Sequence, residues 1–236
     1  MEIRGERECK DCGRQWSYYE TGSVSCPSCG SMRSVGVGDR EQHTAAQVTL
    51  DLSTHRAAVG DGTIRDAAPE LKSDLRTYIR KTGFIHGGEL QPLDDTTLAA
   101  HELLQAVDIV ARSNRPTDDE QLFVIELLRG ADNGNRPDPA SVPASLAAAR
   151  GLGYANAIEA YHHDVSTWLD EHPDPEARTT LGTLSNHLKR VEALEGDIPV
   201  SESETLVRVA HDIYIYLTAD DLDALASARD QLSSLF

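Results

Sequence analysis

The sequence predicts a mainly α-helical protein with a small zinc-binding β module at its N-terminus. All four cysteines of the 236 residues lie within the first thirty, as two Cys-x-x-Cys pairs that are each followed by glycine. Leucine and alanine recur at helical spacing from residue 66 to the end of the chain. No apolar run approaches the length of about 18 residues that a membrane-spanning helix needs. Together these features indicate a small metal-held module joined to a larger helical domain.

The cysteine pairs occupy positions 9–12 and 26–29, and Gly13 and Gly30 follow them. Two such pairs can bring four thiolates to one tetrahedral centre, which is the geometry of a zinc site. Glycine suits the positive φ that a turn around a sulfur often needs. With four protein ligands, no position is left for water or substrate, so the expected metal is structural. The sequence therefore predicts one Zn²⁺ bound by Cys9, Cys12, Cys26 and Cys29.

Two other uses of the cysteines stay open. Disulfides are disfavoured because no apolar signal segment precedes Cys9, and the thiols of intracellular proteins are kept reduced. An iron–sulfur cluster would use the same four thiolates, but the paired spacing with following glycines favours zinc. We therefore expect a cytoplasmic zinc protein.

Residues 1–42 are expected to form a small β zinc ribbon. The segments 15–19 and 32–37 have the aromatic and alternating pattern of short strands, and each follows a cysteine turn. The side chains expected to cover the metal are Trp16, Tyr18 and Val35.

Residues 43–65 are expected to be a linker between this ribbon and the helical domain. Alternating apolar residues within it could form a short docking strand. These residues are Val48, Leu50 and Leu52. The sequence Gly-Asp-Gly at positions 60–62 then breaks the chain before the helices begin.

Residues 66–236 are expected to form an antiparallel bundle of about six to seven helices, each burying one face. The first of these helices is expected over Pro69–Lys81. The segment 131–143 holds three prolines and is expected to be a loop that could separate two helical subdomains.

Several helix starts are marked by side chains that can accept hydrogen bonds from free backbone N–H groups. Capping boxes are expected at 117–120 and 201–204. Asp94 or Asp95 is expected to begin one further helix, and Asp174, which is followed by proline, another.

The formal net charge of −17 is distributed unevenly along the chain. Residues 1–42 carry six basic and seven acidic side chains, whereas residues 43–236 carry sixteen and thirty-two. A nucleic-acid-binding surface normally shows a basic stripe, and the helical domain has none. The acidic balance, with four lysines against eighteen arginines, is typical of proteins from salt-loving archaea.

Histidines of the helical domain are the other candidates for a site. Glu159 and His162 share a helix face as in carboxylate-bridged di-iron bundles, but the motif is not repeated in the chain. His187, His211 and Asp212 occur in an order that resembles the metal-dependent HD phosphohydrolases, which are also all-helical. Too few residues follow Asp212 for the helical insert of that family. No nucleophile-elbow, P-loop or dinucleotide-binding glycine motif occurs, so we expect a protein without enzymatic activity.

The run Cys9-Lys10-Asp11-Cys12-Gly13, continued by Trp16 and by Cys26-Pro27-Ser28-Cys29-Gly30, resembles the zinc ribbons of transcription-factor-B type and of related RNA-polymerase and ribosomal proteins. With its acidic helical remainder, the whole chain resembles a family of haloarchaeal zinc-ribbon proteins with no established activity. A transcription-factor-B protein would continue into two cyclin-like repeats, and the region after residue 66 is too short and too acidic for these. The resemblance implies the four cysteines as metal ligands and no further site residue.

These features favour a binding module that contacts a protein of the transcription or translation machinery. The alternative is a nucleic-acid-binding ribbon, which would use nearby aromatic side chains together with Arg4, Arg7, Arg14 and Arg33. An all-helical metal-dependent hydrolase is the third interpretation. A basic face on the ribbon would favour the alternative, and a cleft that gathers the histidines with carboxylates would favour the hydrolase.

Overall fold

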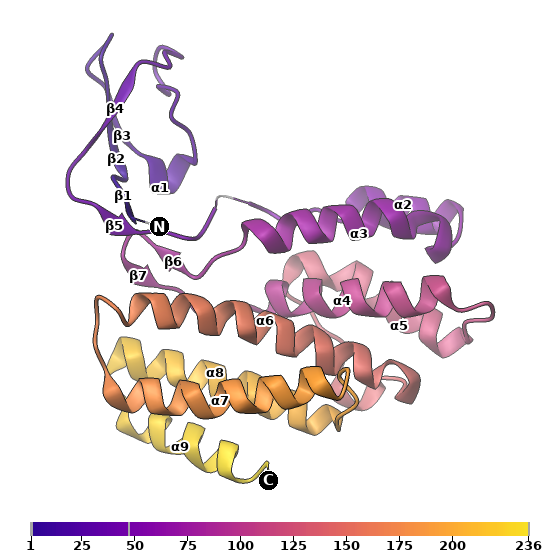
Figure 1. Ribbon diagram of the computed structural model, residues 1–236. Coiled ribbons are helices and arrows are strands. Elements are labelled where there is room, and N and C mark those ends of the chain that lie inside the picture. The colour runs from indigo at the N-terminus through magenta and orange to yellow at the C-terminus, as the bar shows by residue number, and fades with distance from the viewer. Residues whose placement is uncertain (1, 47, 236) are drawn as a thin grey trace.

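The computed structural model describes residues 2–46 and 48–235 and confirms a mainly α-helical chain with an N-terminal β module (Figure 1). The strands are β1 (Glu2–Ile3), β2 (Glu6–Cys9), β3 (Gln15–Ser17), β4 (Ser34–Val37), β5 (Glu41–Gln42), β6 (Ile85–His86) and β7 (Glu89–Leu90). The α-helices are α1 (Tyr18–Thr21), α2 (Ser53–Asp61), α3 (Ile64–Lys81), α4 (Asp95–Arg112), α5 (Asp118–Gly130), α6 (Ala147–Trp168), α7 (Pro175–Ala193), α8 (Val200–Ala219) and α9 (Leu222–Ser233).

The ribbon is built on a three-stranded antiparallel sheet with the order β3-β2-β4. Strand β2 lies in the centre, where Arg7 pairs with Trp16 on one side and with Gly36 on the other. Trp16 is buried beside Cys9 and Cys26, as expected. The expectation that Tyr18 and Val35 cover the metal is wrong. Tyr18 begins the short helix α1, and the alternation of β4 turns Val35 to the exposed face of the sheet.

The expected linker is partly folded, because residues 53–61 form α2. Leu50 and Leu52 are buried in the helical core without forming the strand that their alternation suggested. The backbone N–H of Leu52 donates to Asp132, and Arg56 of α2 forms an ion pair with the same carboxylate at 2.8 Å. These contacts fasten α2 to the turn after α5, and α3 begins at Ile64 rather than near Pro69.

The helical region has two apolar cores that lie side by side. Helices α2 to α5 surround one core, which includes Leu71, Leu103 and Leu127. Helices α6 to α9 surround the other together with residues from the β6–β7 hairpin. Helices α4 and α6 pack against each other where the two halves meet (Figure 1). Residues 131–143, expected to be a loop, hold two short 3₁₀ turns at 131–133 and 139–141.

The caps agree with the sequence at three of four helix starts. Thr117 and Glu120 form the expected capping box, and Asp94 and Asp174 accept bonds from the first turns of α4 and α7. The capping box expected at 201–204 is wrong. The N-cap of α8 is Pro199, whose restricted φ precedes the helix, so the serines after it lie inside the first turn.

A fully buried arginine joins the two halves. Arg150 of α6 donates to Glu102 of α4 at 2.6 Å, to Glu204 of α8 at 3.2 Å and to the Pro137 carbonyl at 2.9 Å. Burial raises the pKa of Glu102, and the charge of Arg150 opposes this rise. No helix within residues 2–46 and 48–235 combines the length and apolar character that crossing a membrane requires.

Candidate metal centre

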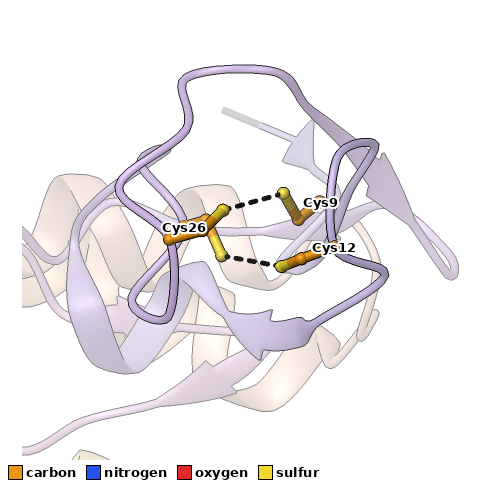
Figure 2. A group of neighbouring side chains, drawn as sticks. Cys9, Cys12 and Cys26 are labelled. Atoms are coloured by element: carbon orange, nitrogen blue, oxygen red, sulfur yellow. Dashed lines mark hydrogen bonds between the residues drawn. The ribbon is translucent and has the colours of Figure 1, made fainter.

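The four cysteines meet at one end of the ribbon, where two turns face each other. Their sulfur atoms all lie within 4.8 Å of one another. Figure 2 shows Cys9, Cys12 and Cys26 with their sulfurs turned inward, and the dashed lines mark the 3.6 Å separations of Cys9 from Cys29 and of Cys12 from Cys26. A Zn–S bond of about 2.3 Å in a tetrahedron places the sulfurs about 3.8 Å apart. A disulfide would require about 2.05 Å. All four cysteines are free thiols, and their spacing fits a single metal ion.

The two cysteine turns repeat the same backbone bonds. In the first, the N–H of Cys9 donates to the carbonyl of Arg14 at 2.8 Å and the N–H of Gly13 donates back to the Cys9 carbonyl at 3.0 Å. In the second, Cys26 donates to Ser31 and Gly30 donates to Cys26, both at 2.9 Å. Gly13 and Gly30 have φ values of +74° and +71°, as the sequence predicted. A side chain at either position would be strained, so glycine is what lets each turn close around its sulfurs.

Backbone hydrogen bonds favour the thiolate form of the first cysteine of each pair. The first cysteine of each pair is buried and the second is exposed. Hydrogen bonding by the Cys12 backbone is the main cause that lowers the pKa of Cys9. Burial acts to raise the pKa of Cys26, but hydrogen bonds from the Cys29 and Ser28 backbone outweigh it and lower the pKa to about 7. Backbone hydrogen bonds from Arg14 and Ser31 act to lower the pKa of Cys12 and of Cys29, but neighbouring sulfurs outweigh them, so the pKa of Cys12 is raised and that of Cys29 rises to about 12. Metal binding requires deprotonated cysteines, so the first cysteine of each pair is the one that its turn prepares as a thiolate.

A polar clamp holds the two turns together from outside. Asp11, in the first turn, accepts from Arg33 at 2.7 Å and from Ser31 at 2.5 Å, both next to the second turn. Because all four ligands come from the protein, this centre can hold a metal ion in a closed shell. A closed centre stabilises the fold and leaves no position at which a substrate could bind the metal.

The structure does not gather the histidines into a second site. His162 is half-buried on α6, and His187 is buried on α7. His211 hydrogen-bonds the carbonyl of Leu93 at 2.8 Å, which is a structural role. Within residues 2–46 and 48–235, the cysteines are the only group of His, Cys, Asp or Glu side chains with the spacing of a metal site.

Of the four ribbon arginines considered as nucleic-acid contacts from the sequence, two line a cleft and two do not. Arg4 and Arg7 line a cleft between the ribbon and the helical region, whereas Arg14 lies outside the cleft and Arg33 is paired with Asp11. Two further cations of the cleft, Arg40 and Lys81, were missed. They are more than forty residues apart in the sequence, so no local motif signals that they meet.

The class is therefore that of a ribbon module whose four cysteines could hold a metal ion, joined to a mainly helical region. The chain belongs to DUF7117, a family of unknown function, whose model matches residues 1–232. Comparisons with curated proteins and with solved structures give no match.

Proposed function

We propose that this protein is a non-enzymatic interaction module in which one structural Zn²⁺ holds the ribbon in shape. The closed four-cysteine centre carries this proposal, because such a centre builds a binding surface without offering an open coordination position. Zinc is the metal that suits four thiolates at these separations when no redox role is required. The acidic excess of the helical region suits a cytoplasm with multimolar salt, as in salt-loving archaea.

The partner that we assign to this surface is a protein of the transcription or translation machinery. Three apolar side chains of the ribbon are exposed beside the second cysteine turn, namely Val24, Met32 and Val35. Hydrogen bonds from Ser25 to the Met32 sulfur and from Ser34 to the Val24 carbonyl hold these segments together. Exposed apolar side chains on a rigid frame are a common feature of protein-binding surfaces.

Affinity purification from the native host tests this assignment, with and without nuclease. Met32→Asp is the test variant, and Leu122→Asp on α5 is its matched control, since the two side chains are 68% and 63% exposed. We expect the wild-type protein and the Leu122 variant to retain the same nuclease-resistant proteins, and the Met32 variant to lose them. Equal retention by both variants would contradict this binding surface.

A second function, nucleic-acid binding by the ribbon, is favoured by one observation. Arg4 and Arg7 lie on the same side of the ribbon, and among the described residues neither is ion-paired to a carboxylate. In the purification above, partners that disappear on nuclease treatment would favour this second function.

A further inference from the structure

A cleft of about 800 Å³ lies between the ribbon and the helical region. Its walls come from β1, β2, α1 and β4 of the ribbon, from residues 43–46, and from Lys81 at the end of α3. In Figure 1 the ribbon stands beside this end of α3. The volume lies in the range of pockets that hold small ligands.

Four cations line the cleft in a chain whose net charge is −17. They are Arg4, Arg7, Arg40 and Lys81, and the single carboxylate in the lining is Glu2. Within the described part of the chain, none of the four cations forms an ion pair, although many other cations of this protein do. Cations left unneutralised in such an acidic protein create a local positive potential that attracts an anion.

Two of these cations are held in place by the ribbon itself. The Arg7 guanidinium donates to the Ser34 hydroxyl at 2.9 and 3.0 Å, and Arg4 donates to the Gly38 carbonyl at 2.7 Å. These neutral partners fix the positions of the side chains without cancelling their charge. A guanidinium fixed in this way loses little conformational entropy when it binds a phosphate.

Aromatic rings line the cleft beside these cations. Tyr18, Tyr19 and His43 are half-buried, with the Tyr19 and His43 ring centroids 4.7 Å apart. Burial is the main cause that lowers the pKa of His43, and the nearby His86 adds to it. Aromatic side chains next to cations are the combination that binds a nucleobase and its phosphate together.

We propose that this cleft binds a nucleotide unit, with its phosphate at the cations and its base against the tyrosines. This proposal goes beyond the interaction module above and does not depend on the identity of the protein partner. Two sources could supply the ligand, namely a single-stranded nucleic acid or a free nucleotide. Duplex nucleic acid is disfavoured because its bases are stacked and cannot reach the tyrosines.

Fluorescence anisotropy with a labelled oligouridine tests the proposal, with AMP, inorganic phosphate and oligoglutamate as competitors. The test variant is Arg40→Glu/Lys81→Glu, whose side chains are exposed and need not support the fold. Its matched control is Arg76→Glu/Arg129→Glu, which makes the same charge change at exposed sites outside the cleft. We expect the test variant to weaken binding at least tenfold and the control to change it little. Losing two phosphate contacts on a single strand should also reduce the slope of log K against log salt by about 1.4.

The competitors identify the ligand. If unlabelled oligouridine displaces the probe and AMP does not, the ligand is a single-stranded nucleic acid. If AMP displaces the probe as well as unlabelled oligouridine does, the ligand is a free nucleotide. Tyr18→Ala should weaken binding and Tyr18→Phe should restore it, while helicity and zinc content report that each variant is folded. Four results would overturn the proposal: no binding of any probe, equal loss in the control pair, full competition by inorganic phosphate, or full competition by oligoglutamate.

Discussion

Replacing Cys26 and Cys29 by serine should unfold the ribbon and leave the helical region intact. The apolar core of the ribbon consists of Trp16 and two of the metal ligands, Cys9 and Cys26. Burying one large side chain contributes about 3 kcal/mol. Binding of a structural Zn²⁺ contributes about 10–16 kcal/mol in small zinc modules. A bound Zn²⁺ would therefore supply most of the free energy that folds this segment, and the two remaining cysteines could not form a closed four-ligand centre.

The helical region should not depend on the metal. Among residues 2–46 and 48–235, the buried side chains of its two apolar cores begin at Leu50, with Val48 packed against one of them, and the ribbon contributes one helix of four residues, α1. Far-ultraviolet circular dichroism of the double variant should therefore retain nearly all of its helical signal. Hydrogen exchange followed by mass spectrometry should show loss of protection confined to the ribbon.

The matched control for this experiment is Ser28→Ala, which lies between the two replaced cysteines and is exposed. It should keep wild-type zinc content and wild-type protection. Loss of helical signal across the whole chain in the cysteine variant would refute the reasoning, because it would show that the ribbon is part of the main core. Contacts across the junction include hydrogen bonds, such as Gln42 to the Thr167 carbonyl at 3.0 Å and Thr44 to Asp164 at 2.6 Å, and a ring contact of Tyr19 with His86 whose centroids lie 5.7 Å apart.

Three further predictions concern the helical region. Arg150→Met leaves Glu102 buried without its ion-pair partner and should lower the free energy of unfolding in denaturant by about 3–5 kcal/mol. The control Arg178→Met removes an exposed ion pair and should lower it by no more than about 1 kcal/mol. Equal decreases in the two variants would contradict the role of burial. Burial lowers the pKa of His101 to about 4, so its stabilising neutral form is fully present above the unfolded pKa of about 6.5 and is lost as the pH falls toward 4. His101→Gln should therefore flatten the decline of stability between about pH 6.5 and 4, and an unchanged profile would contradict this. The melting temperature should rise with KCl concentration, because salt screens the repulsion among the carboxylates: the Debye length falls from about 30 Å at 0.01 M to about 3 Å at 1 M. A melting temperature that does not change with KCl would contradict the proposed adaptation to salt.

Local signals in the sequence were sufficient for the four-cysteine cluster and for the starts of three helices, α4, α5 and α7. The four cysteines are close in sequence, and the following glycines report the φ that each turn requires, so their meeting could be predicted from spacing alone. The caps at Asp94, Thr117 and Asp174 depend only on bonds within one helical turn.

Features that depend on distant partners were not predicted. The residues before α3 were expected to be a linker. The ion pair that holds α2 in place joins Arg56 to Asp132, 76 residues away, and no local pattern reports it. The buried role of Arg150 is invisible in sequence, because its partners lie on two other helices. Arg40 and Lys81 come to line one cleft only when the ribbon and α3 have folded against each other. The arginines of the ribbon sequence alone therefore could not reveal the cleft.

The most direct test of a metal-held ribbon is the metal content and thiol state of protein purified without added metal. Elemental analysis together with mass spectrometry under native and denaturing conditions measures both. We predict one zinc per chain, four reduced cysteines after the metal is removed, and loss of zinc when Cys26 and Cys29 are replaced. Substoichiometric zinc accompanied by disulfides, or iron in place of zinc, would contradict this prediction.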